Sequence, residues 1–358
     1  MATATMFRPF AWAALVVLLT GMQTAHAAPL VYVPLGSDDK IVIVDAATDK
    51  IVDTIGGVEA VHGLAKSPDG RFLIAGSYAE RDVKGAAVAK PAGVSEDEHA
   101  AHHTAPAPGA STAGSVVSTV SVIQTADGAI IRRIDVPGAV HHVSVSPDGR
   151  FAVVTHPNES AISVIDLASY AAVTSVSTGP LPNYAVFSPD SGKVYVSNAG
   201  NGTVSEVDTE RWIVRRNFVT GASPEHMVLS RDGRRLYVAN VNAGTVSEIM
   251  TEGGSTERTF DIGGALHGID LSKNGQTLFV SALDRDKLVA INLSTSEMRE
   301  APLGPAPYHA AAIGSTGKLY VSSADEPNVW VIDQESLAVR GVIAIGGKAH
   351  QIVISPGL

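Results

Sequence analysis

Histidines recur at one place in an internal repeat of this chain. The repeat carries a Ser-Pro-Asp-Gly turn or a degenerate form of it, and the informative position lies five residues before its serine. In chain order this position holds His62, His141, Asn183, Glu225, His267, His309 and His350. The next position adds His142 and His226, so seven of the 12 histidines fall in a two-residue window. Because imidazole and carboxylate groups bind Zn²⁺ and Cu²⁺, the pattern predicts a transition-metal site if the repeats converge.

The candidate ligands are therefore defined by their place in the repeat. They are His62, His141, His142, Glu225, His226, His267, His309 and His350. A tetrahedral ion takes only four of them. Since Asn183 and Glu225 interrupt the series, we expect a site biased toward the arc from Glu225 to His350. The alternative is structural: each histidine caps a strand or bonds a neighbouring carbonyl group.

A second group of histidines lies in an insertion spanning residues 80–115. His99, His102 and His103 follow three acidic residues there, ahead of an Ala/Pro/Gly/Ser-rich stretch. This composition predicts a mobile loop that captures metal ions, and the alternative is a plain solvated linker. We expect the loop to emerge on the face of the histidine series. The same face should carry His156 and acidic loop residues, namely Asp38, Asp39, Asp284, Asp286, Asp325 and Glu326.

The repeat itself predicts the elements that hold these residues. Each unit has a short apolar strand, the turn, and further strands such as Arg235–Ala239 and Thr203–Val207. A period near 40 residues with four strands per unit is the signature of a β-propeller. The N-terminal strands lack a first strand, and the final copy, His350–Ser355, supplies one. We therefore predict an all-β fold of seven four-stranded antiparallel blades, with one blade completed from both ends of the chain.

Two copies of the second strand carry a recognisable motif. Arg235–Asn240 reads RLYVAN and Lys193–Asn198 reads KVYVSN, which resemble the YVTN family of propeller repeats. That family includes YncE-like proteins and relatives of the cytochrome d1 and nitrous oxide reductase propellers. The resemblance implies a seven-bladed fold and a central channel that holds metal clusters or haem d1 in some members. The plan is also similar to that of the AztD-type periplasmic zinc chaperones.

Composition limits the partners and the compartment. Net charge is −10 and lysines and arginines form no block, which argues against nucleic acid. The chain has no cysteine, so disulfides and thiolate sites are excluded. Residues 1–27 read as a secretory signal peptide, with an apolar run and an Ala25-His26-Ala27 end, and the alternative is an uncleaved anchor. We expect residues 28–358 to be a periplasmic monomer with no membrane span.

These features predict a metal-binding propeller that traffics zinc or copper, with the ion as cofactor. Its expected partner is a periplasmic metal-binding or transporter protein. One alternative is an enzyme of lactonase or lyase type, with Glu225 and the channel histidines as acid and base. The chain shows no Ser-His-Asp arrangement, phosphate loop or HExxH motif to support an enzyme. The other alternative is a binding scaffold for a tetrapyrrole or a protein.

Overall fold

The computed structural model describes Met1, residues 29–82 and residues 116–355. The predicted signal peptide falls almost wholly outside these residues. So does most of the insertion, with His99, His102 and His103, and both assignments stay predictions. Within the part described, no helix is long and apolar enough to cross a membrane.

The described strands form seven antiparallel sheets that follow one another along the chain. Blade 1 contains β29 (Val353–Ser355), β1 (Leu30–Leu35), β2 (Lys40–Asp45) and β3 (Lys50–Gly56). Blade 2 contains β4 (Val61–Lys66), β5 (Phe72–Ser77), β7 (Val116–Gln124) and β8 (Ile130–Pro137), with β6 (Arg81–Asp82) paired to β7. Blade 3 contains β9 (Val143–Val145), β10 (Phe151–His156), β11 (Ala161–Asp166) and β12 (Ala171–Ser177).

The remaining blades are regular copies of one another. Blade 4 contains β13 (Pro182–Phe187), β14 (Lys193–Asn198), β15 (Thr203–Asp208) and β16 (Ile213–Val219). Blade 5 contains β17 (Pro224–Leu229), β18 (Arg235–Asn240), β19 (Thr245–Met250) and β20 (Thr256–Asp261). Blade 6 contains β21 (Leu266–Leu271), β22 (Thr277–Ala282), β23 (Lys287–Asn292) and β24 (Met298–Pro302). Blade 7 contains β25 (Pro307–Ile313), β26 (Lys318–Ser323), β27 (Asn328–Asp333) and β28 (Val339–Ala344).

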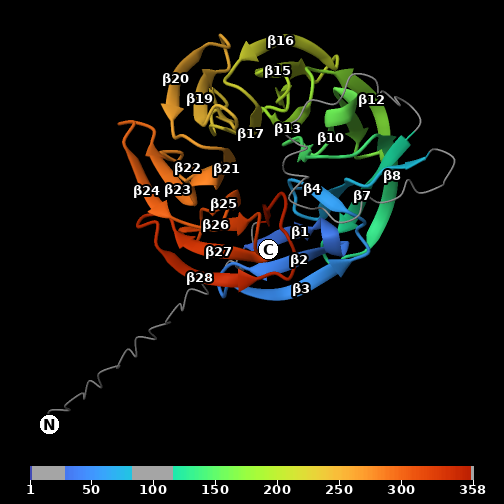
Figure 1. Ribbon diagram of the computed structural model, residues 1–358. Coiled ribbons are helices and arrows are strands. Elements are labelled where there is room, and N and C mark those ends of the chain that lie inside the picture. The colour runs from blue at the N-terminus through green and yellow to red at the C-terminus, as the bar shows by residue number, and fades with distance from the viewer. Residues whose placement is uncertain (2–28, 83–115, 356–358) are drawn as a thin grey trace.

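The first and last strands of the described chain meet in blade 1, as predicted. Leu30 pairs with Ser355 and Tyr32 with Val353, so β29 becomes the innermost strand beside β1. Figure 1 shows the blades arranged around a central axis, with strands such as β4, β17 and β21 toward the centre and β3, β16 and β28 at the rim. The all-β, seven-bladed prediction is confirmed. Three short 3-10 helices complete the described elements, namely η1 (Gly36–Asp38), η2 (Pro157–Glu159) and η3 (Leu283–Arg285).

Apolar residues of the middle strands hold adjacent blades together. Val31 and Val33 of blade 1, for example, pack in one buried cluster with Tyr320, Val329 and Val331 of blade 7. Strand residues alternate between the two faces of a sheet, and each blade has a neighbour on both faces. The second and third strands are therefore apolar along most of their length. The rigid ring that results fixes the positions of the inner strands relative to one another.

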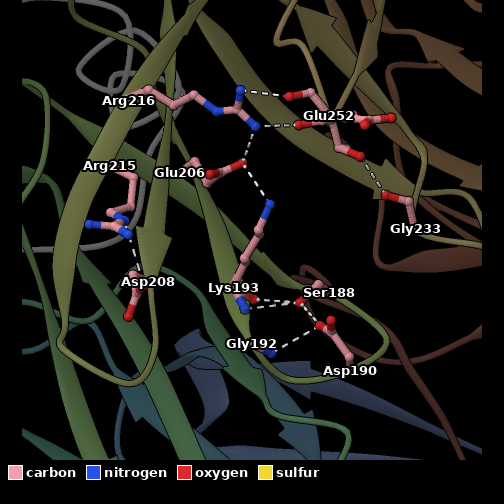
Figure 2. Close-up of polar contacts among 11 residues, drawn as sticks. Ser188, Asp190, Gly192, Lys193, Glu206, Asp208, Arg215, Arg216, Gly233 and Glu252 are labelled. Atoms are coloured by element: carbon pink, nitrogen blue, oxygen red, sulfur yellow. Dashed lines mark hydrogen bonds and ion pairs between the residues drawn. The ribbon is translucent and has the colours of Figure 1, made fainter.

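Polar contacts add a second link between blades 4 and 5 (Figure 2). The Glu206 carboxylate, nearly buried, is 2.9 Å from Arg216 and 3.4 Å from Lys193. The Arg216 guanidinium also donates to the backbone oxygens of Thr251 and Glu252 in the next blade. An arginine that satisfies a buried carboxylate and two carbonyl groups ties one blade to the next.

Candidate metal centre at the channel mouth

The first strands of most blades are irregular where the histidines lie. In β17, Pro224 pairs with Asn240 and the next paired residue is Met227, so Glu225 and His226 fall in a bulge. Equivalent register shifts occur in β4, β13, β21 and β25. In blades 1 and 3 the first strands β29 and β9 begin only after their histidines, which shortens the predicted His350–Ser355 strand. Bulges re-aim side chains, and here they turn the candidate ligands inward.

The bulge residues form two layers, and the structure corrects the repeat alignment at His309. Backbone N–H groups of His142, Tyr184 and His309 donate to hydroxyl groups of Thr155, Ser197 and Ser322 in the second strands. His309 is thus equivalent to His142 rather than to His141. Because the turn of blade 7 is a degenerate Gly-Ser-Thr-Gly, the alignment of the repeats by sequence was displaced by one residue in that blade. The outer layer is His62, His141, Asn183, Glu225, His267, Tyr308 and His350, and the inner layer is Gly63, His142, Tyr184, His226, Gly268, His309 and Gln351.

Three inner-layer histidines from alternate blades converge, and we call His142, His226 and His309 the central triad. One ligand nitrogen from each lies within 4.8 Å of the other two. Ring centroids are 5.0 Å apart for His142–His226, 4.9 Å for His226–His309 and 6.1 Å for His142–His309. All three side chains are at most 4% exposed. Three imidazoles with an open fourth position are a frequent zinc ligand set.

Four ring nitrogens of the central triad lack hydrogen-bond partners among the described residues. They are Nε2 of His142, Nε2 of His309 and both ring nitrogens of His226. His142 places Nδ1 3.0 Å from the Asn183 carbonyl oxygen, which fixes Nδ1 as the donor and leaves the Nε2 lone pair for a ligand. Buried polar atoms are rarely left without a partner, so these nitrogens point to a bound group.

Burial also keeps the triad in the ligand form. Desolvation lowers the pKa of His226 to about 3, and it holds the pKa of His142 and of His309 well below the usual value. The neighbouring imidazoles add to the effect, because charging one ring disfavours charging the next. Neutral imidazole is the form that binds metals.

Two further groups share residues with the triad. His62, His141 and His142 form one, and Glu225, His226 and His267 form the other, each with ligand atoms within 4.8 Å. Burial raises the pKa of Glu225 to about 8, so its carboxyl group is protonated at neutral pH in the metal-free protein.

The triad overlaps the expected arc in part: His226 and His309 lie within it, as does the group of Glu225, His226 and His267. His142 joins the triad from outside that arc. His350 belongs to none of the three groups found among the described residues. His350 instead stacks on His62, with ring centroids 4.1 Å apart.

Aromatic and amide residues that the sequence reasoning missed complete the cluster. Tyr308 stacks on His267 at 3.6 Å between ring centroids, and Tyr184 packs on His226 at 5.0 Å. Tyr184 and Gln351 occupy the inner-layer position of their blades, so the repeat alignment contained the signal. His156, on the same face, is held by the Ala139 carbonyl oxygen and Ser163 Oγ and is a structural residue.

Gln351 separates the cluster from the other half of the channel. Its Oε1 accepts from the Leu64 and Val143 N–H groups, and its Nε2 donates to the Val143 carbonyl oxygen. Below it lies a cavity of about 620 Å³ with largely apolar walls, lined also by Asp270. Burial raises the pKa of Asp270 to about 6.

Comparison with known proteins agrees with this architecture. Residues 152–315 match the family model of the lactonase 7-bladed beta-propeller. The protein is a seven-bladed β-propeller. The part of this propeller that matches the family model runs from β10 into blade 7. No curated protein matches the sequence significantly.

Solved propellers of several activities superpose on this one. The periplasmic gluconolactonase PpgL of Pseudomonas aeruginosa has a TM-score of 0.70 at 17% identity, over 92% of this chain and 99% of that one. Hydrazine synthase of Kuenenia stuttgartiensis has a TM-score of 0.66 at 17% identity, over 90% and 99%. Dihydro-heme d1 dehydrogenase NirN, in complex with DHE, has a TM-score of 0.61 at 14% identity, over 88% and 63%. These identities establish the fold alone, and the family model favours the lactonase alternative over a metal carrier.

Proposed function

We propose that this protein is a metal-binding propeller that holds one Zn²⁺ or Cu²⁺ ion at the central triad. The observation that carries the proposal is the set of buried triad nitrogens without hydrogen-bond partners among the described residues. Several kcal/mol of desolvation cost would otherwise remain uncompensated. A bound cation with imidazole ligands offsets this cost, and imidazole suits both metals.

A carrier role fits the enclosure of this site. The eight candidate ligands are all at most 8% exposed, so an ion at the triad is shielded from bulk solvent. Such an enclosed site favours retention of a bound ion over catalytic turnover of a large substrate. Together with the predicted signal peptide, this enclosure supports a periplasmic zinc or copper carrier that delivers its ion to a binding protein or a transporter. The His-rich insertion remains the proposed collector of ions.

The test begins with elemental analysis of native protein purified without a His-tag. Apo-protein is then titrated with Zn²⁺ or Cu²⁺ against a competing chelator. We expect about one tightly held ion per chain and a loss of affinity of about 100-fold or more in His226→Ala. His156→Gln, which removes a buried histidine of the same face, should leave affinity unchanged. Binding no tighter than that of a scrambled His-rich peptide contradicts the proposal.

A lactonase-type enzyme is the second candidate, and the family match over residues 152–315 is the observation that favours it. Glu225 would act as the general acid, since a carboxyl group with a pKa of about 8 carries a proton at neutral pH. His267, in the same group, would act as base. Hydrolysis of gluconolactone that survives a chelator and disappears in Glu225→Gln would support this candidate over the carrier. Absence of hydrolysis across a lactone panel would remove it.

A further inference from the structure

A surface pocket lies beside the channel-mouth cluster, at the junction of blades 7 and 1. We call it the junction pocket, and its volume is about 330 Å³. It is lined by Ser37, Asp38, Asp325, Pro327, Gly346, Gly347, Lys348 and His350. These residues come from the β1–β2, β26–β27 and β28–β29 connections, all on the histidine face. The pocket therefore lies where an ion would approach the cluster.

His350 links this pocket to the buried histidines. It lines the pocket and, at 8%, is the most exposed of the candidate ligands. Its ring stacks on His62 at 4.1 Å between centroids, and His62 lies 5.7 Å from His142 of the central triad. The steps between rings are short enough for an ion to pass from one imidazole to the next without returning to water.

The size and lining of the pocket suit a hydrated divalent cation. Six waters at about 30 Å³ each occupy roughly 200 Å³, which the pocket can hold. Asp38 and Asp325 supply oxygen groups that hard, hydrated ions accept, and Lys348 also lines the pocket. Lys40 also approaches Asp38, at 3.8 Å between Nζ and Oδ1. The carboxylates favour capture, and the imidazole of His350 offers the first nitrogen ligand.

The opposite end of the channel offers a poorer route. Gln351 bridges backbone groups of β4 and β9 just below the cluster, and it lies 3.5 Å from the Tyr184 hydroxyl. An ion entering from the far cavity would have to break these bonds. At the junction pocket, by contrast, His350 both lines the pocket and stacks on His62.

We propose that the junction pocket is the entry and exit station for the metal ion, which passes through His350 and His62 to the central triad. This inference rests on the proposed metal-binding function and adds the route by which the ion reaches the central triad. Substitution of a residue on the entry pathway changes the rates of metal loading and release together. Substitution of a ligand of the final site instead changes the equilibrium dissociation constant of the metal ion.

The experiment measures loading of the apo-protein by stopped flow, with Zn²⁺ and a chromogenic chelator, and release into excess chelator. His350→Gln, and separately Asp38→Asn with Asp325→Asn, should each slow loading and release by about 10-fold or more. The equilibrium dissociation constant should stay within about threefold of the native value. Asp284→Asn, on the same face outside the pocket, and Asp270→Asn, in the far cavity, are the matched controls and should load at the native rate.

Unchanged rates in both pocket variants would overturn the route. A large loss of affinity in His350→Gln with a native loading rate would also overturn it, because His350 would then be a ligand of the final site. The carboxylate variant keeps the test valid if His350→Gln folds poorly. If native protein binds no ion at equilibrium, the proposed function itself fails.

Discussion

At the scale of residues, identical side chains in this protein have different roles because their hydrogen bonds differ. His156 has both ring nitrogens bonded, to a carbonyl oxygen and to a hydroxyl group. His226 is equally buried, yet neither of its nitrogens has a partner in the described part of the chain. Both imidazoles are kept neutral by burial. Only an imidazole with a free lone pair can take a metal ion, which separates a structural histidine from a candidate ligand.

The pKa of His156 gives a prediction for stability against pH. Burial lowers this pKa to about 4 from 6.5, although the bond to Ala139 acts in the opposite direction. The unfolded chain therefore binds a proton first as pH falls, so the stability contributed above pH 6.5 is lost between pH 6.5 and 4. From pH 7 to pH 4 the stability advantage of the native protein over His156→Gln should shrink by about 3 kcal/mol. Urea unfolding of both apo-proteins at the two pH values measures it, and parallel pH profiles would contradict it.

At the scale of elements, the inner strands approach so closely that some blades have no room for a side chain. Gly268 follows His267 in β21, and a Cβ there would lie 2.4 Å from the Ala310 nitrogen and the Tyr308 oxygen of blade 7. Gly63 occupies the same inner-layer position in blade 2 and faces the backbone of His141 and His142 at 2.9 Å. Because the inner-layer position has no side chain in these two blades, the histidines at that position in other blades can meet.

Gly268→Ala should therefore force blades 6 and 7 apart. We expect the free energy of unfolding to fall by about 1–3 kcal/mol, since the clash is with backbone atoms that cannot rotate away. Gly341→Ala, in the outer strand β28 with open space around its Cα, is the matched control. Equal denaturation midpoints for the two variants would show that the inner strands can separate at little cost.

At the scale of the whole molecule, closure of the ring creates the site. The central triad comes from blades 3, 5 and 7, and Gln351 reaches the channel from the segment just before the final strand, β29. β29 also covers the hydrogen-bonding edge of β1, while Ile352 and Ile354 pack against the core between blades 1 and 7. A ring open at this point would expose a strand edge and lose the geometry of the channel.

Removal of residues 349–358 should consequently abolish the cooperative unfolding transition or lower its midpoint by more than about 10 °C. A chain ending at Ser355 keeps β29 and should melt like the native protein. Differential scanning calorimetry of the two truncated chains makes the comparison. A native transition in the shorter chain would mean that β29 contributes little to closure.

Much of the fold could be predicted because it depends on local rules. The Ser-Pro-Asp-Gly turns, the apolar second and third strands, and the unmatched strands at the two ends determine seven blades and their closure. The histidine positions followed from the same repeat. The alignment failed at His309 because the left-handed glycine of the blade 7 turn is displaced by one residue. Gly317, at φ 70°, lies four residues after Ile313, whereas Gly233 of blade 5 lies three residues after Ser230.

The sequence alone therefore determined the all-β propeller, its closure by the last strand and the gathering of histidines near one channel mouth. The tertiary structure decided which of those histidines meet. Bulges sort them into two layers, and glycines at Gly63 and Gly268 make space. Hydrogen bonds then occupy His156 and leave the nitrogens of His142, His226 and His309 facing one another. Spacing along a chain fixes a residue's place in its blade, whereas the direction of its lone pair depends on contacts between blades far apart in sequence.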